Sequence, residues 1–344
     1  MGYYDGTKLL SLSDANGDKP EIYMVTTNRS GGKTTYFGRM VVNRWFKDHS
    51  RKFALLYRFN NELDDVADKF YKDIGSLFFQ GSEMTSKLKS KGTYAELRIN
   101  DEICGYAIAL NNADKIKKMS HLFSDVDSII FDEFQSEVNH YCNDEVNKFV
   151  SIHTSIARGQ GKFSRYVPVY MIANPVTILN PYYVIMGITD RLNDSTNFLR
   201  GNGWVLEQGF VEDASKAQQT SAFNRAFENS DYTAYNAQAV YLNDSKVFIE
   251  KVNGRSQYVA TIKFRNREFA IRRFDELGII YCDGNADSSY PLKISVTLDD
   301  HNVNYVMLKQ NEFFIDNMRY YFNRGCFRFK DLRCKDAVMN LLKY

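Results

Sequence analysis

The chain has 344 residues, with 44 Lys and Arg against 42 Asp and Glu, and a net charge of +2 excludes a uniformly basic or acidic protein. This length is enough for two domains of roughly 150 residues each. Five cysteines without a C-x-x-C pair argue against a disulfide framework and a zinc knuckle, and they favour a reducing cytosol.

The first predicted elements are a strand over 22–25 and a helix over 35–46, joined by the segment TTNRSGGKTT at 26–35. The end of this segment matches the phosphate-binding loop pattern G-x-x-x-x-G-K-[ST], although Thr27 stands where the first Gly belongs. A loop between a strand and a helix aims backbone N–H groups at an anion, at the positive end of the helix. The predicted nucleotide-binding residues are Asn28, Arg29, Ser30, Gly31, Gly32, Lys33, Thr34 and Thr35.

Within this loop, the two glycines keep side-chain bulk away from the phosphates. Lys33 would reach the β and γ phosphates of ATP, and Thr34 would bind Mg²⁺. Because Thr27 is β-branched, we expect the start of the loop to be wider than usual. The alternative is a glycine-rich surface turn.

Further apolar runs continue the strand and helix alternation, which predicts a parallel sheet with crossover helices. The predicted elements are strands over 53–57, 129–131 and 167–173, a helix over 61–79, and a hairpin within 92–110 that turns at Asn100-Asp101-Glu102. The apolar stretch 166–188 is interrupted by prolines, so we expect a buried strand, a loop and a second apolar element, and no membrane span.

The strand at 129–131 leads into two adjacent carboxylates, Asp132 and Glu133. Asp132 would hold the Mg²⁺ ion, and Glu133 would orient and deprotonate the attacking water. A solvated acidic turn is the alternative. Together with the phosphate loop, this pair predicts ATP hydrolysis, and hydrolysis coupled to motion in particular.

Other polar residues are candidates for completing such a site. Arg158, beside Gly159, could project into a neighbouring subunit and offset charge on the γ-phosphate, whereas Arg29 is a rival that would act within its own chain. Asn174 follows the strand at 167–173 and could contact the γ-phosphate or cap a loop. Lys117 and Lys118 precede the acidic strand, where they could contact a neighbour's nucleotide or form a solvated basic turn.

The remainder of the chain divides into a polar segment and a second domain. Residues 191–240 show a helical stretch over 213–227 and no strand-like run, which predicts a helical lid or linker. Predicted strands return at 247–250, 258–264, 268–272, 278–282 and 293–297, followed by helices over 310–322 and from 331. Residues 241–344 hold 17 Lys and Arg against 13 Asp and Glu. An anionic polymer is one partner that this charge favours, and a basic surface helix is the alternative reading.

Taken in order, these motifs resemble the packaging ATPases of small phi-29-like tailed phages, and the resemblance covers nearly the whole chain. The matching features are the Arg within the phosphate loop, Phe-Asp-Glu-Phe at 131–134, Arg158 before a strand that ends in Ala-Asn, Asn-Pro-Tyr at 180–182, and Val-Phe-Ile-Glu-Lys at 247–251.

The resemblance implies an α/β fold. A P-loop domain of the additional-strand class would occupy 1–195, a helical lid or linker 196–240, and an RNase H-like α+β domain without its nuclease acids 241–344. It also implies a motor that pumps double-stranded DNA as a homo-oligomeric ring, a pentamer, at the portal of a procapsid in the host cytoplasm. A structural RNA is left open as a further partner.

By position, the resemblance assigns phosphate and Mg²⁺ binding to Lys33 and Thr34, metal binding and catalysis to Asp132 and Glu133, and the trans-acting finger to Arg158. It also assigns γ-phosphate sensing to Asn174. An apparent insertion at 159–166 leaves Arg165 as an alternative finger. The candidates for DNA contact are Arg324, Arg328 and Lys330.

Two other functions remain open from the sequence. One is a terminase-like protein whose second domain still cuts DNA, with metal bound by Asp283 and by Asp299 or Asp300. The other is a nucleotide-gated assembly module without turnover, suggested by Thr27 in the phosphate loop.

Overall fold

The computed structural model describes residues 3–138, 140–158, 164–189, 191–192, 196–226, 248–307 and 311–342, with only the backbone at 306–307. The chain divides into two compact units, Met1–Asn243 and Asp244–Tyr344.

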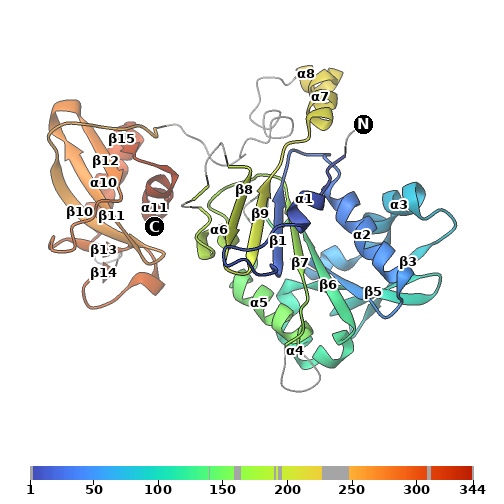
Figure 1. Cartoon of the computed structure of the whole chain (residues 1–344). Helices are drawn as coiled ribbons and strands as arrows, with labels where there is room; N and C mark the ends of the chain where they lie inside the picture. The colour runs from blue at the N-terminus through green and yellow to red at the C-terminus, as the bar shows by residue number, and fades with distance from the viewer. Residues whose placement is uncertain are drawn as a thin grey trace. The chain divides into compact units, whose positions relative to one another are not determined.

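The first unit alternates strands and helices through most of its length, as Figure 1 shows. Its elements are α1 Thr7–Leu10, β1 Ile22–Thr26, α2 Lys33–Lys47, β2 Lys52–Tyr57, α3 Val66–Phe78, β3 Met84–Lys89, β4 Tyr94–Ile99, β5 Glu102–Ala109, α4 Ala113–Lys118, β6 Val126–Asp132, α5 Glu145–Ile156, β7 Val169–Ala173, α6 Pro181–Ile185, β8 Phe198–Gly201, β9 Trp204–Gln208, α7 Glu212–Thr220 and α8 Ala222–Ala226.

Among the described residues of this unit, nine strands form one sheet in the order β3-β4-β5-β2-β6-β7-β1-β9-β8. The strands from β5 to β9 in this order are parallel, and antiparallel strands flank them at both edges. Strand β7 lies between β1 and β6, which lead into the phosphate loop and the acidic pair. An additional strand between these two defines the class predicted for this domain, and the fold prediction is confirmed.

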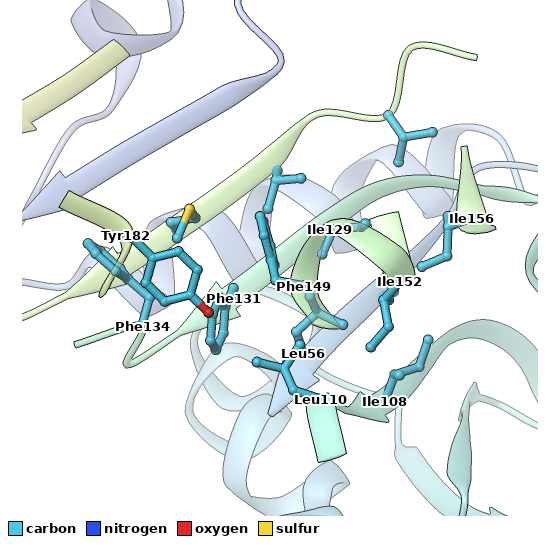
Figure 2. Close-up of a cluster of buried hydrophobic side chains, with 14 of the residues drawn as sticks. Leu56, Ile108, Leu110, Ile129, Phe131, Phe134, Phe149, Ile152, Ile156 and Tyr182 are labelled. Carbon is cyan, nitrogen blue, oxygen red and sulfur yellow. The ribbon is translucent and has the colours of Figure 1, made fainter. Parts of the chain in front are cut away.

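Helices cover both faces of the sheet, so its central strands are buried on both sides. Along β1, Tyr23 and Val25 pack into the cluster beneath α2 and α3, whereas Met24 packs into the cluster beneath α4 and α5. Figure 2 shows this second cluster, in which Phe131 of β6 stacks on Phe149 of α5 with ring centroids 5.9 Å apart. The two cores fix the carboxyl ends of β1 and β6 at the same end of the parallel strands, with β7 between them.

The expectation of no strand between 191 and 240 is wrong. Strands β8 and β9 form a hairpin there, and β9 pairs in parallel with β1 from Ile22↔Trp204 to Thr26↔Gln208. The sheet of the first unit therefore continues past residue 195. The hairpin is short and turns through Asn202 and Gly203, which has φ of 76°, so turn-forming residues dominate the segment. The predicted helix appears as α7 and α8, and its last predicted residue, Phe227, lies outside the described residues.

The second unit is a mixed sheet with two helices. Its elements are β10 Gln257–Phe264, β11 Arg267–Phe274, β12 Ile279–Asp283, β13 Lys293–Ser295, β14 Val306–Met307, α10 Glu312–Asn323, β15 Phe327–Phe329 and α11 Leu332–Leu342. Its six described strands run in the order β14-β13-β10-β11-β12-β15.

Strands β10, β11 and β12 form an antiparallel meander, and β13 and β14 continue in parallel beside β10. These directions agree with an RNase H-like sheet, to which β15 adds a strand that the sequence did not predict. The strand predicted over 247–250 is only an isolated bridge between Ile249 and Phe329, and Val247 lies outside the described residues. Within the part of the chain that the structure describes, no helix has the length and apolar character needed to span a membrane.

Candidate nucleotide site

The phosphate loop lies where it was predicted, between β1 and the first turn of α2. Ser30 and Gly32 have left-handed φ values of 61° and 90°, and Gly32 caps α2. The side chain of Asn28 is buried, with Oδ1 accepting from the N–H of Val211 at 2.8 Å and Nδ2 donating to its carbonyl at 3.1 Å. Asn28 therefore ties the loop to the segment after β9, and only its backbone remains for a ligand.

Lys33 is the first residue of α2, and its ammonium group is buried within the loop. Nζ donates to the carbonyl oxygens of Thr27 at 3.1 Å and Asn28 at 3.3 Å, and to Oδ1 of Asn174 at 3.2 Å. Burial lowers the pKa of Lys33 to about 8, and the charge of Asp132 opposes this shift. The structure thus brings the predicted phosphate ligand and the predicted sensor, Asn174, into direct contact.

Thr27 has a specific place in the loop, which explains why the first glycine of the pattern is not needed. Its hydroxyl donates to the carbonyl of Asn28 at 3.0 Å and accepts from Nζ of Lys33 at 2.9 Å. A Cβ added to Gly31 would lie 2.9 Å from this hydroxyl oxygen. The hydroxyl of Thr27 therefore occupies the space that a side chain at position 31 would need.

The predicted metal ligands lie in contact. Oγ1 of Thr34 donates to Oδ2 of Asp132 at 2.7 Å across a separation of 98 residues. Burial raises the pKa of the Asp132 carboxyl, whereas hydrogen bonds from Thr34 and from the N–H of Glu133, and the charge of Lys33, lower it. A hydroxyl and a carboxylate in contact are the hard oxygen donors that suit Mg²⁺.

Glu133 adopts a left-handed backbone, with φ of 54°, immediately after β6. Partial desolvation raises the pKa of its carboxyl, the charges of Asp132 and Glu137 add to this shift, and Arg29 opposes it. Arg29 lies in the phosphate loop with its NH1 3.6 Å from Oε1 of Glu137. The carboxyl group of Glu133, the candidate base, is therefore influenced by the carboxylates of Asp132 and Glu137 and by the guanidinium group of Arg29.

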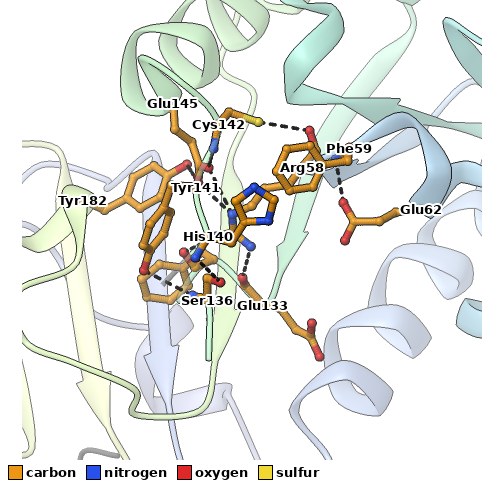
Figure 3. Close-up of polar contacts among 11 residues, drawn as sticks. Arg58, Phe59, Glu62, Glu133, Ser136, His140, Tyr141, Cys142, Glu145 and Tyr182 are labelled. Carbon is orange, nitrogen blue, oxygen red and sulfur yellow. Dashed lines mark hydrogen bonds and ion pairs between the residues drawn. The ribbon is translucent and has the colours of Figure 1, made fainter. Parts of the chain in front are cut away.

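A buried ion pair that the sequence reading missed holds the backbone at Glu133. Arg58, which follows β2, donates from NH1 to the carbonyl of Glu133 at 2.8 Å and from NH2 to that of Phe134 at 2.6 Å. Its Nε lies 3.0 Å from Oε2 of Glu145, the first residue of α5. Tyr182 donates from its hydroxyl to Oε1 of the same carboxylate at 2.9 Å (Figure 3).

Both members of this pair are almost fully buried, with side-chain exposures of 8% for Arg58 and 1% for Glu145. A buried charge is stable only when paired and hydrogen-bonded, which this network achieves. The sequence contained one signal for it, an arginine at the carboxyl end of a buried strand beside the predicted site.

Arg158 and the two lysines lie near the amino-terminal ends of the parallel strands, away from the phosphate loop. Arg165 donates from NH2 to the carbonyl of Ile156, which ends α5, at 2.7 Å, and from NH1 to that of Val126, which begins β6, at 3.2 Å. Asp132 lies at the other end of β6, and the seven residues of this strand separate Val126 from Asp132 by about 20 Å. Lys117 and Lys118 end α4 and are exposed, as is Arg158. Residues 159–163 lie outside the described residues.

In the second unit, two of the three carboxylates considered for a nuclease site, Asp283 and Asp300, have other partners. Oδ2 of Asp283 lies 2.8 Å from Nε of Arg272, and Asp300 accepts from the N–H groups of Arg265 and Asn266. Among the residues that the structure describes, no cluster of three or more His, Cys, Asp or Glu side chains could hold a metal ion.

The three candidates for DNA contact differ in their surroundings. Arg328 forms an ion pair with Glu250, with Nε 2.6 Å from Oε1. Arg324 is exposed and lies over the ring of Tyr320, 3.5 Å from its centroid. Lys330 lines a cavity with Arg267 and other residues.

Comparisons with known proteins agree with this geometry. The family model described as Podovirus DNA encapsidation protein (Gp16) matches residues 2–344. The DNA packaging protein of Bacillus phage phi29 is 22% identical over 99% of this chain and 97% of its own length, and that of Bacillus phage B103 is 24% identical over 92% and 93%. A solved structure of the bacteriophage Phi-29 viral genome packaging motor assembly covers 100% of this chain and 99% of its own, with 21% identity and a TM-score of 0.71.

Proposed function

Because the chain belongs to the Podovirus DNA encapsidation protein (Gp16) family, we propose that it is an ATPase that drives double-stranded viral DNA through the portal into a procapsid. The contact of 2.7 Å between Thr34 and Asp132 is the observation that carries the ATPase proposal. It unites the end of the phosphate loop with the end of the acidic strand, as a nucleotide-hydrolysing site requires.

Binding of ATP would rest on the loop and on Lys33. The backbone N–H groups at the start of α2 offer partial positive charge to the phosphates, and Lys33 adds a full charge. Nζ of Lys33 already has four oxygen partners, three in the loop and Oδ1 of Asn174, so phosphate oxygens would replace some of them. Asn174, one of these partners, would thereby respond to the γ-phosphate.

Hydrolysis would rest on Asp132 and Glu133. Thr34 and Asp132 would hold Mg²⁺, which neutralises charge on the phosphates when bound. Glu133 would accept the proton of the attacking water, and its raised pKa brings it closer to the working pH, as general-base catalysis favours. Arg58 would keep the backbone of Glu133 in position through the hydrogen bond to its carbonyl.

A homo-oligomeric ring explains the position of Arg158. Arg158 lies near the amino-terminal ends of the parallel strands, whereas the phosphate loop lies at their carboxyl-terminal ends. Arg158 would therefore complete a neighbour's site, with Lys117 and Lys118 as further contacts in trans. Arg165 is held by two carbonyl oxygens, so its role is to fix the base of the loop that carries Arg158. We propose that the ring is a pentamer and that it works at the portal of the procapsid in the host cytoplasm. A structural RNA is a further candidate partner.

The decisive experiment measures ATP hydrolysis with and without double-stranded DNA, in the presence of portal-bearing procapsids. We expect DNA-stimulated hydrolysis by the wild-type chain and protection of the DNA from added nuclease. Glu133→Gln should bind ATP and fail in both assays. Normal hydrolysis by this variant would contradict the assignment of the base, and no turnover by the wild-type chain would favour an assembly module.

A further inference from the structure

Gln135 follows Glu133 by two positions, and its polar side chain is buried, with an exposed fraction of 2%. Its Oε1 accepts from the N–H groups of Val176 at 2.9 Å and Thr177 at 3.0 Å, both in the loop that leaves β7. These two donors fix the orientation of the amide, because its NH2 group in the same place would meet two further donors. Gln135 therefore ties the segment after β6 to the loop after β7.

The loop after β7 also carries the candidate γ-phosphate sensor. Oδ1 of Asn174 accepts from Nζ of Lys33 at 3.2 Å. Only Pro175 stands between Asn174 and Val176. A proline fixes its own φ and restricts the residue before it, so this connection is stiff. A displacement of Asn174 is therefore passed on to the N–H of Val176.

On the other side, Gln135 continues directly from the candidate base. The N–H of Phe134 donates to the carbonyl of Ile172 in β7 at 3.2 Å, so the segment after β6 is held to β7 by its backbone as well. Glu133 has a left-handed φ of 54°, a conformation that persists only where its surroundings hold it. A change in the position of Gln135 thus reaches the residue whose orientation is most sensitive to it.

The amide nitrogen of Gln135 shows which part of the side chain is used. Nε2 and the hydroxyl of Tyr183 are buried close together, yet neither makes a hydrogen bond of normal geometry with the residues that the structure describes. A buried polar atom without a good partner costs stability. A methionine of similar length would avoid this cost and would lose only the bonds from Val176 and Thr177. The contribution of the amide therefore lies in these two bonds.

We propose that Gln135 is a positioning residue that couples Asn174, the candidate sensor, to the orientation of Glu133. This inference rests on the proposed function, because it concerns the same ATP site. Phosphate oxygens that replace Asn174 on Lys33 would change the position of the loop after β7. The two N–H bonds to Gln135 would carry this change to the segment of the base.

The test compares a ligand with a γ-phosphate and a ligand without one. Dissociation constants of β,γ-imido-ATP and of ADP are measured with the full chain and Mg²⁺, for the wild type, Gln135→Met, Asn174→Ala and the double variant. Gln135→Met should bind the ATP analogue about tenfold more weakly, within the range typical of coupling between two sites, and should bind ADP normally. The double variant should bind the analogue no more weakly than Asn174→Ala, because both changes interrupt one path.

Turnover gives a second readout. At saturating ATP, Gln135→Met should turn over more slowly than the wild type, since Glu133 loses its fixed place. Gln135→Glu keeps an acceptor oxygen at the same distance and should restore both turnover and preference for the ATP analogue. If Gln135→Met does not fold, Gln135→Asn, which is shorter by one methylene, supplies the same comparison.

Asn180→Ala is the matched control. Its side chain holds the far end of the same loop, accepting from the N–H of Tyr183 at 3.0 Å and donating to the carbonyl of Thr177 at 2.8 Å. This variant should lower the melting temperature and leave the ratio of the two dissociation constants unchanged.

The outcomes separate this inference from the proposed function. Unchanged affinities in Gln135→Met, equal weakening of both ligands, or additive losses in the double variant would show that Gln135 only supports the fold, and the ATP site would stand. If the wild-type chain binds neither nucleotide, both proposals are wrong.

Discussion

Arg58 and Glu133 are linked by a hydrogen bond of 2.8 Å from the guanidinium group to a backbone carbonyl, across 75 residues of sequence. The bond reaches Glu133 at the point where its backbone takes a left-handed φ of 54°. Such a conformation costs free energy in a residue with a side chain and persists where its surroundings hold it. The candidate base therefore depends on a neighbouring strand for its orientation.

Arg58→Ala should reduce ATP hydrolysis strongly and leave ATP binding intact, because the side-chain hydrogen bonds of Arg58 go to Glu133, Phe134 and Glu145 rather than to the described residues of the loop. It should also destabilise the fold by about 3–5 kcal/mol, since Glu145 would remain buried without its partner. Thermal unfolding measures the second effect, and turnover measured well below the melting temperature gives the first.

The double variant Arg58→Ala with Glu145→Ala separates positioning from stability. It removes both buried charges, so part of the lost stability should return while hydrolysis stays low. Recovery of hydrolysis together with stability would show that Arg58 acts on the fold alone.

Glu133→Gln should lower turnover by about 10²–10⁴-fold, the usual contribution of a general base. ATP affinity should stay within a factor of two or so, because the amide keeps the shape of the side chain. Glu137→Gln is the matched control: Glu137 lies near Arg29 and raises the pKa of Glu133, so its loss should shift the acid limb of the pH–rate profile to lower pH. An unchanged profile would place Glu137 outside the site.

Binding of ATP at Lys33 should be accompanied by a proton uptake that depends on pH. Because burial lowers its pKa to about 8, part of the population is neutral at pH 8, and a bound triphosphate favours the charged form. Binding at pH 8 should therefore take up about half a proton, and binding at pH 6.5 should take up almost none at this group.

Calorimetry in two buffers of different ionisation enthalpy measures this uptake, with Lys33→Arg as a control that stays charged at both pH values. The same shift affects folding in the absence of ligand. Since the unfolded chain holds the proton up to about 10.5, this lysine makes stability rise with pH between about 8 and 10.5. Equal proton uptake at both pH values would contradict a depressed pKa.

Mixed rings test the assignment of Arg158. Arg158→Ala rings should lose hydrolysis by about 10³–10⁵-fold, the range for an arginine finger. Rings that mix Arg158→Ala with Glu133→Gln subunits should regain turnover, because an intact Arg158 then faces an intact Glu133 at some interfaces. Arg165→Ala should instead lower the melting temperature, as it loses bonds to two carbonyl oxygens. No recovery in mixed rings would place the finger elsewhere.

Salt dependence of DNA binding tests the basic residues of the second unit. Arg324→Gln and Lys330→Gln should each reduce the slope of log affinity against log salt by about one unit, if each contacts a phosphate. Arg328→Gln should have a smaller effect, since Glu250 already neutralises it. Arg273→Gln is the control, because Arg273 is already paired with Asp275, whose Oδ1 lies 2.6 Å from its Nε.

The phosphate loop and the acidic pair were predictable from sequence because each consists of consecutive residues. The phosphate loop needs a strand, two glycines, a lysine and a helix in order, and the acidic pair needs one apolar strand before it. The structure brings Lys33, Thr34, Asp132 and Asn174 together as their positions at the carboxyl ends of parallel strands imply.

Features that depend on distant contacts were not predictable. Strand β9 is paired by β1, about 180 positions earlier, and its own sequence lies within a polar, turn-rich segment. The ion pair of Arg58 and Glu145 spans 87 residues, and the place of Arg58 after a buried strand does not show in sequence which residue pairs with it. The contacts of Thr27 were also not predictable, because its hydroxyl meets Lys33 and the space above Gly31 only in three dimensions.

Helix α5 begins at Glu145, whose carboxylate holds Arg58, and the chain reaches Arg158 two residues after the helix ends at Ile156. Its 12 residues extend about 18 Å along the sheet. One helix thus has its first turn in the hydrogen-bond network behind Glu133, the proposed base, and its last turn close to Arg158 in the sequence. In the proposed ring, a tilt of the first turn would move Arg158 and would thereby link the state of one site to the next.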